Sequence, residues 1–193
     1  MKRVFAITCL LQFIVVATTT LPASASGKQI VPGRSIDSLH LGARDTVLKK
    51  LAPLPGYEED STMGHTWRAF RSSDGSHSLE VYMVRDDPGL ITTIRQIRIA
   101  SPYFHTSQGI HTGDSLSHIL KAFPGVKLIS RYTYTSKRVD VYDDRKRGIA
   151  FEFKPATTTS NEQCTAILIH PRGKSVTEEY MSEYKNLDGK PAG

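Results

Sequence analysis

The chain has 193 residues, of which 39% are hydrophobic, and it carries a net charge of +6 at pH 7. A chain of this size buries enough surface to fold without covalent cross-links, as one domain or as two small halves that share a core. The mild positive charge favours anionic partners and gives no information about the fold.

The first 25 residues have the features of an export signal. A positively charged start precedes an apolar stretch over 4–17, and Ala23-Ser24-Ala25 supplies the small residues of a cleavage site. The stretch is too short for a permanent membrane span, which takes about 20 residues. Cys9 leaves with the signal, so only Cys164 remains and no internal disulfide can form. We therefore expect an exported protein, periplasmic or secreted, with no permanent membrane span.

The rest of the chain contains the same pattern twice. The matching segments fall in the same order in both copies, which is hard to obtain by chance. We therefore predict two tandem repeats, 34–102 and 106–173, followed by a polar tail over 174–193. The matching segments are Leu39-His40-Leu41-Gly42, Leu79-Glu80-Val81-Tyr82 and Ile97-Arg98-Ile99 in the first copy, and Ile110-His111-Thr112-Gly113, Val139-Asp140-Val141-Tyr142 and Ile167-Leu168-Ile169 in the second.

Each copy is predicted to begin with a helix. In the first copy, apolar residues between 47 and 51 form a short helical stripe. The second copy has the clearer pattern, with apolar residues on one face over 116–123 and with Asp114 and Ser115 placed to cap the free N–H groups. We expect the first helix to be the shorter one, because it lacks such a cap.

After each helix the apolar period changes to two, which is typical of strands. Two units of this kind predict an α+β fold, in which the tandem helix-then-strands repeats form one antiparallel sheet with the helices packed on one face. The predicted strands span 66–71, 78–84 and 92–100 in the first copy, and 127–135, 138–142, 149–153 and 165–170 in the second.

These segments resemble a known family. The apolar lead, glycine, cap and apolar helix, followed by strands, are similar to the superfamily that contains the beta-lactamase inhibitor protein and the outer-membrane assembly lipoproteins of the SmpA/OmlA, or BamE, type. The inhibitor protein is a tandem pair of such units whose concave sheet binds a protein partner, so the resemblance implies this fold over most of 34–172. The residues that carry it are Leu39-His40-Leu41-Gly42 with Val47, Leu48 and Leu51, and Ile110-His111-Thr112-Gly113-Asp114-Ser115 with Ile119 and Leu120.

The sheet face opposite the helices is the predicted binding site. Alternation in the matching strands directs Val81 and Val141 towards the helices, and Tyr82 and Tyr142 away from them. Aromatic rings of this kind recur in protein interfaces, although they also pair across strands and shield a sheet. The predicted partner-binding residues are Trp67, Tyr82, Tyr132, Tyr134 and Tyr142.

The sequence holds no pattern typical of catalysis or of a cofactor. His105, His111 and His118 lie close together along the chain, but without the tight spacing of a zinc site. Cys164 and His170 are six residues apart on one predicted strand, too far for a nucleophile–base pair. We therefore predict no catalytic residue, metal or cofactor, and we expect Cys164 to be a small buried side chain.

A basic run, Arg145-Lys146-Arg147, lies at a predicted hairpin tip with Lys137 and Arg138 nearby. Such a run is usually a solvated turn, and its alternative role is contact with phosphate or an anionic polymer. The sequence thus predicts a non-enzymatic module that binds a protein partner in the cell envelope or outside the cell, and no nucleic acid. The alternatives are a small metal-dependent or hydrolytic enzyme and a polyanion-binding envelope component. The sequence does not indicate the oligomeric state.

Overall fold

The computed structural model describes residues 28–51, 64–72, 77–85, 91–134, 137–154 and 162–179. The predicted export signal lies outside these residues, as does the predicted tail from residue 180 onward.

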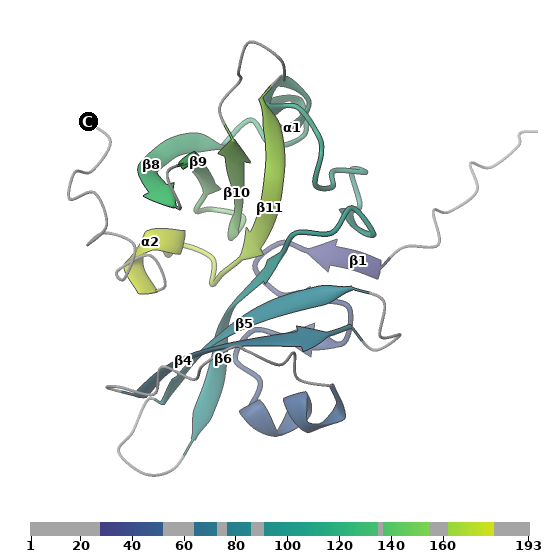
Figure 1. The fold of residues 1–193 in the computed structure, drawn as a ribbon, viewed down its shortest axis with the longest axis vertical. Coiled ribbons are helices and arrows are strands. Elements are labelled where there is room, and N and C mark those ends of the chain that lie inside the picture. Colours follow the sequence, from purple (N-terminus) through teal and green to yellow (C-terminus); the bar gives the residue numbers. More distant parts are fainter. Residues whose placement is uncertain are drawn as a thin grey trace, which may run out of the picture.

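An antiparallel sheet of seven strands forms the centre of the fold (Figure 1). Its strand order is β4-β5-β6-β11-β10-β9-β8, so strands from the two predicted repeats meet where β6 pairs with β11. The strands are β4 (His65–Arg71), β5 (Ser78–Arg85), β6 (Thr92–Ile99), β8 (Lys127–Tyr134), β9 (Lys137–Asp144), β10 (Ile149–Lys154) and β11 (Gln163–Ile169).

In the residues that the structure describes, a second, smaller sheet and three short helices pack around it. The small sheet has the order β3-β2-β1-β7, with β1 parallel to β7. None of the helices in the described part of the chain combines the length and the apolar character that crossing a bilayer requires. The elements are β1 (Lys28–Val31), β2 (Ser35–Ile36), β3 (Leu39–His40), the 3-10 helix η1 (Asp45–Lys50), β7 (Phe104–Thr106), α1 (Leu116–Ala122) and α2 (Val176–Glu179).

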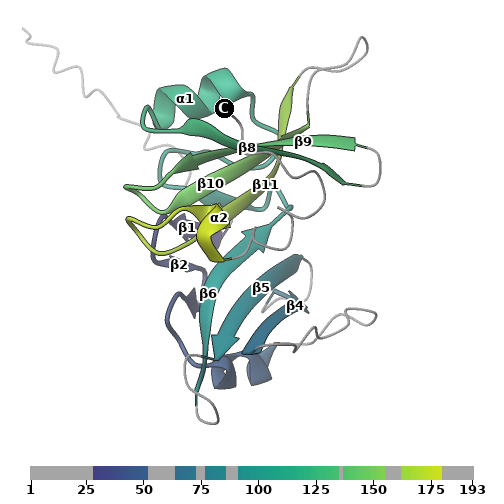
Figure 2. The same cartoon turned by 90° about the vertical axis from the view of Figure 1, so that its left-hand side faces the viewer.

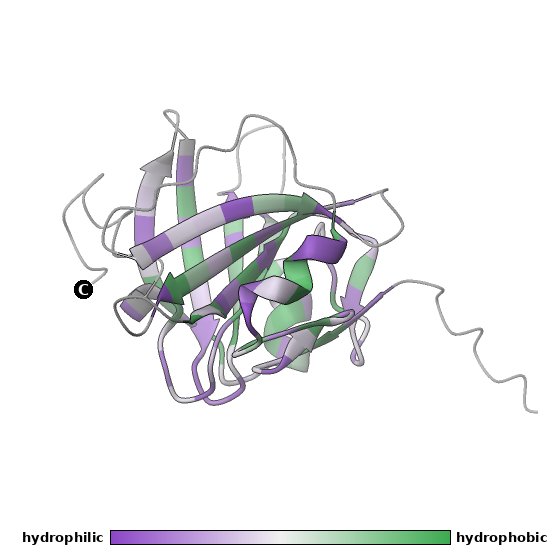
Figure 3. Ribbon diagram, turned by 90° about the horizontal axis from the view of Figure 1, so that it is seen from below, coloured by the Kyte–Doolittle hydropathy of each residue, from purple (hydrophilic) through white to green (hydrophobic). Residues whose placement is uncertain are grey.

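Both faces of the large sheet are covered. Figure 1 places α1, β1 and η1 on one side of the sheet and α2 on the other, and Figure 2 shows α2 in front of β11. The side with α1 carries the larger core, which contains Val81, Ile97, Phe151 and Ile167. Apolar and polar residues alternate along the strands, as the colours of Figure 3 show, because successive side chains point to opposite faces.

The predicted α+β fold class is wrong, because the protein is mostly β. About half of the described residues, 52%, lie in strands and only 14% in helices. The expected first helix is a 3-10 helix of six residues without a side-chain cap hydrogen bond. Much of the face expected to lie under helices is instead covered by the small sheet. Strands of two to four residues are too short to show an apolar period, and the pairing of β1 with β7 joins segments that are distant in sequence.

The second predicted helix is confirmed as α1. Its N-cap is Ser115, whose hydroxyl oxygen accepts the backbone N–H of His118 at 3.2 Å. Ile119 and Phe123, two residues of the predicted apolar stripe, are fully buried.

The two halves of the chain share one set of backbone hydrogen bonds. The N–H of Gly42 donates to Ile94 at 2.7 Å, and the N–H of Gly113 donates to Cys164 at 2.8 Å. In return, Ile94 donates to the carbonyl of Ala43 and Cys164 donates to that of Asp114, both at 2.9 Å. The pairing of β5 with β6 and that of β10 with β11 also share a β-bulge at the same place, between residues 82 and 83 and between residues 152 and 153.

β6 and β11 lie about a pseudo-two-fold axis. Ile97 pairs with Ile169, Arg98 with Leu168 and Ile99 with Ile167. Each segment thus pairs with its own counterpart in the predicted repeat, as in an interface with two-fold symmetry.

This symmetry corrects the predicted match between Tyr82 and Tyr142. Tyr82 of β5 pairs with Gln96 of β6. In the second half, the residue that corresponds to Gln96 is Ala166 of β11, and it pairs with Glu152 of β10. The counterpart of Tyr82 is therefore Glu152. The two similar tetrapeptides therefore lie on strands that are not equivalent, because the second half of the sheet places β10 between β11 and β9. As a result, the predicted common face of the two tyrosines is wrong.

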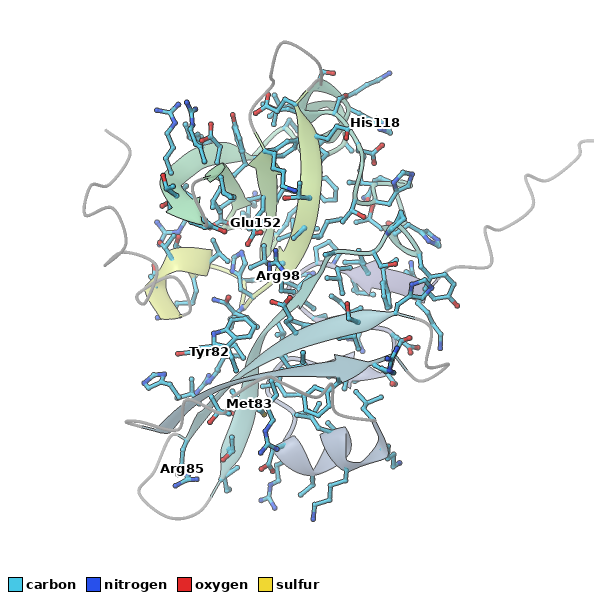
Figure 4. All side chains as sticks on the ribbon, viewed as in Figure 1. Tyr82, Met83, Arg85, Arg98, His118 and Glu152 are labelled. Carbon is cyan, nitrogen blue, oxygen red and sulfur yellow. The ribbon has the colours of Figure 1, made fainter. Side chains whose placement is uncertain are left out.

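A buried ion pair crosses the axis on the side of α2. The guanidinium of Arg98 donates to both carboxylate oxygens of Glu152, at 3.1 and 2.7 Å, and to Glu80 at 2.9 Å. The Glu152 side chain is only 3% exposed. Figure 4 shows Arg98 and Glu152 beside each other where the two halves of the sheet meet. The pair therefore ties β6 to β10 across the intervening β11.

We predict that Arg98→Met destabilises the protein by about 3–5 kcal/mol, because it leaves the Glu152 carboxylate buried without a counter-charge. The double variant Arg98→Met/Glu152→Leu should recover most of this loss, since both charges are then removed. Urea unfolding of both variants, with exposed Lys121→Ala as the control, measures the effect. A loss below about 1 kcal/mol in the single variant would show that the pair is not buried as described.

Candidate functional site

The predicted aromatic face is a second core, not an exposed surface. Tyr82 is 2% exposed and Tyr132 is 7% exposed. The ring of Trp67 lies 5.2 Å from that of Tyr82, and the Tyr82 hydroxyl is hydrogen-bonded to His65. Val176 of α2 is fully buried in this core, in a segment predicted to be a polar tail.

Tyr142 lies on the opposite side of the sheet from Tyr82. Its ring contacts Phe153 edge-on at 5.3 Å and packs against the larger core. Tyr134 belongs to β8, but its side chain lies outside the described part of the structure. The structure therefore brings Trp67, Tyr82 and Tyr132 to one face, where Tyr82 and Tyr132 are buried, and separates Tyr142 from them.

Two of the three histidines considered as metal ligands meet at Asp114. The Nδ1 atom of His118 lies 3.0 Å from one oxygen of this carboxylate, and that of His111 lies 3.9 Å from the other. His105 is on β7, paired with Gln29 of β1. Within the described ranges, no group of three His, Cys, Asp or Glu side chains is arranged to hold a metal ion.

Cys164 is a buried side chain, as predicted. It is 2% exposed, and its thiol donates to the carbonyl of Ala166 at 3.3 Å. Burial raises the pKa of this thiol far above its ordinary range. The thiolate, which is the reactive form, is therefore scarce in the folded protein.

Asp143 forms the centre of a buried polar cluster behind α2. One carboxylate oxygen lies 2.9 Å from Nε2 of His170, and the other accepts the Ser175 hydroxyl at 3.3 Å and the N–H of Val176 at 3.1 Å. A Ser-His-Asp triad places the histidine between the other two residues, whereas here the carboxylate lies between them. The cluster therefore holds α2 against the sheet and is not a nucleophilic site.

A basic groove of about 850 Å³ lies at the end of the sheet where β8 begins and β9 ends. Its size is within the range of small-molecule sites, about 300–1,000 Å³. Pro32, Pro124 and Ile129 supply apolar surface. The cations that line it come from three separate parts of the chain and are Lys127, Arg145, Lys146, Arg147 and Arg172.

The turn over 145–148 carries three of these cations, and backbone hydrogen bonds join it to residue 33 and to residues 170 and 173. The carbonyl of Gly148 accepts the N–H groups of Gly33 at 3.0 Å and His170 at 3.2 Å, and the carbonyl of Arg145 accepts that of Gly173 at 2.8 Å. Gly148 has φ +73, and a Cβ there would lie 2.4 Å from the carbonyl oxygen of His170. The basic run is therefore part of a rigid framework rather than a loose solvated turn.

Only some of the groove's positive charge is compensated within the described residues. Arg147 pairs with Asp144 at 3.2 Å and lies 5.4 Å over the ring of Phe123, and Arg145 pairs with Glu178 of α2 at 2.6 Å. Arg172 donates to a neutral acceptor, the carbonyl of Pro32, at 3.3 Å.

Lys127 and Lys146 are exposed, and in the described ranges neither makes an ion pair. The groove therefore keeps an excess of positive charge.

Sequence reasoning found part of this groove and missed the rest. The run over 145–147 is visible as a charge cluster, whereas Lys127 and Arg172 are isolated cations with no local pattern. Only the tertiary fold brings them together, because the turn is hydrogen-bonded to segments more than 20 and 100 residues away in the chain.

Comparison with known proteins gives no functional information. No protein-family model matches the chain, and no curated protein sequence matches it. Among solved structures, the fold is similar to the uncharacterized protein yfeY from Escherichia coli, at 12% identity and a TM-score of 0.38. The match covers 72% of this chain and 98% of that one. A likeness this weak carries no argument, and the resemblance to the inhibitor-protein superfamily stays a prediction.

We predict that Cys164 reacts with a soluble thiol reagent only when the protein opens, because its thiolate is suppressed by burial. Labelling of the native protein should be slower by several orders of magnitude than labelling in urea. Rapid stoichiometric labelling of the native protein would contradict the buried position.

We predict that Glu162→Gln stabilises the protein at neutral pH. Burial, with the nearby charge of Asp140, raises the pKa of Glu162. A carboxyl whose pKa is higher in the folded state lowers the free energy of unfolding as the pH rises from the unfolded-state pKa through the folded-state pKa. The melting temperature of the variant should therefore exceed that of the wild type at pH 7.5, and the two should converge below about pH 4. A difference that is the same at both pH values would contradict this cause.

Proposed function

We propose that this protein is an exported, non-enzymatic binding module whose basic groove holds an anionic ligand. The observation that carries the proposal is the convergence of five cations from three segments on one groove. Export is the expectation from the amino-terminal sequence.

Rigidity supports a binding role for the groove. A site whose side chains stand on a fixed backbone loses less conformational entropy when a ligand binds. The turn over 145–148 meets this condition through its hydrogen bonds to residues 33, 170 and 173. Arginine guanidinium groups add geometric selectivity, since they bind carboxylate or phosphate oxygens in pairs.

The protein partner predicted from the sequence needs a different surface from the one first assigned to it. Tyr82 and Tyr132 are buried, and Tyr142 packs on the other side of the sheet. The protein partner therefore stays a prediction, and no binding surface is assigned to it. The groove, in contrast, is a defined candidate site for an anion.

The test is an anion screen by thermal unfolding at constant ionic strength, on the wild type and on Lys127→Ala/Lys146→Ala. A ligand at ten times its Kd should stabilise the wild type by about 1.4 kcal/mol, or about 3–6 °C for a domain of this size. At least one of phosphate, sulfate, citrate and acetate should produce this shift.

The double variant should lose the shift, because it lacks the two groove lysines that have no ion-pair partner among the described residues. The control, Lys50→Ala/Lys121→Ala, removes the same charge from exposed positions that do not line the groove. Equal responses of the groove variant and the control would refute the proposal.

A further inference from the structure

We infer that the ligand of the basic groove is a multivalent phosphate group, such as a phosphomonoester or a pyrophosphate, rather than a single carboxylate. This inference rests on the proposed function, and it is carried by the charge that the groove's own carboxylates leave unbalanced.

The acidic groups in the groove are already engaged. Asp144 is almost fully buried and accepts both the backbone N–H and the guanidinium of Arg147. Asp143 is held by His170, Ser175 and the N–H of Val176. Within the described residues, neither carboxylate forms an ion pair with Lys127, Lys146 or Arg172.

Three cations remain for a ligand. Within the described residues, Lys127, Lys146 and Arg172 line the groove without a carboxylate partner. One carboxylate brings a single negative charge, whereas a phosphomonoester brings about 1.5–2 near neutral pH and offers three acceptor oxygens. A phosphate group therefore matches the excess charge and the number of donors better.

The carboxylate of Glu178 already occupies a position beside one of the groove's cations, Arg145. Its carboxylate lies 2.6 Å from the Arg145 guanidinium and 3.8 Å from the ammonium of Lys174. Both side chains of the Glu178–Arg145 pair are well exposed, at 39% and 55%. Such an exposed pair contributes little stability, so an incoming phosphate can displace it at small cost.

The experiment is calorimetric titration of the full mature chain with sodium pyrophosphate and, separately, with sodium acetate at the same ionic strength. Pyrophosphate should bind at least about tenfold more tightly than acetate. The Glu178→Gln variant should bind pyrophosphate about two- to fivefold more tightly than the wild type, because the tethered competitor is gone. Lys127→Ala/Lys146→Ala should weaken binding by about tenfold or more, while Lys50→Ala/Lys121→Ala should leave it unchanged.

The gain in affinity with Glu178→Gln cannot arise from misfolding, so it keeps the inference testable even if the lysine variants are unstable. Equal affinity for acetate and pyrophosphate would overturn the phosphate assignment and leave the proposed anion site intact. Absence of heat with both anions, together with absence of any thermal shift in the anion screen, would overturn both.

A second arm separates the two sources of a phosphate group. Co-sedimentation with phosphatidylcholine vesicles that contain phosphatidic acid, compared with phosphatidylcholine alone, tests a lipid headgroup. Capture on the phosphatidic acid vesicles that pyrophosphate reverses supports a lipid phosphate. Pyrophosphate binding without vesicle capture supports a soluble phosphate ligand.

Discussion

The pairing of β6 with β11 is the contact on which the rest of the structure depends. It places Ile97 and Ile99 against Ile169 and Ile167, in the core shared by both halves. Every other strand of the large sheet reaches the opposite half through this pair. On the other face, the bidentate bond from Arg98 to Glu152 spans the same junction. Both core clusters contain residues from the two halves, so we expect the halves to unfold together.

The basic groove is a consequence of how the second half differs from the first. Both halves contain the same glycine hydrogen bonds and the same β-bulge, but the described second half carries β8 outside β9 and a tight turn into β10. That turn reaches residues 32–33 and 172–173, which adds Arg172 to the cations of the turn. The hydrogen bonds that both halves share thus supply rigidity, and the features particular to the second half supply charge.

The sequence predicted what depends on local pattern, and it missed what depends on distant contacts. The capped helix α1 follows from Ser115 and an apolar stripe, and the buried Cys164 follows from its strand position. The small sheet has strands too short to show a period. The predicted match between Tyr82 and Tyr142 is wrong because their tetrapeptides lie on β5 and β9, which the pseudo-two-fold axis does not relate. Alternation within two similar tetrapeptides could not reveal this difference, so it predicted a common face. The groove needed the fold itself, since its cations are scattered along the chain.

The most direct test of this account is to map the ligand's position by NMR. Amide chemical shifts of the protein would be followed during addition of pyrophosphate at constant ionic strength. The account predicts saturable changes confined to residues 123–129, 144–148 and 172–174, with little change along β4 and β5. Changes centred on the face of Tyr82 and Trp67, or weak changes spread over all exposed lysines and arginines, would contradict it.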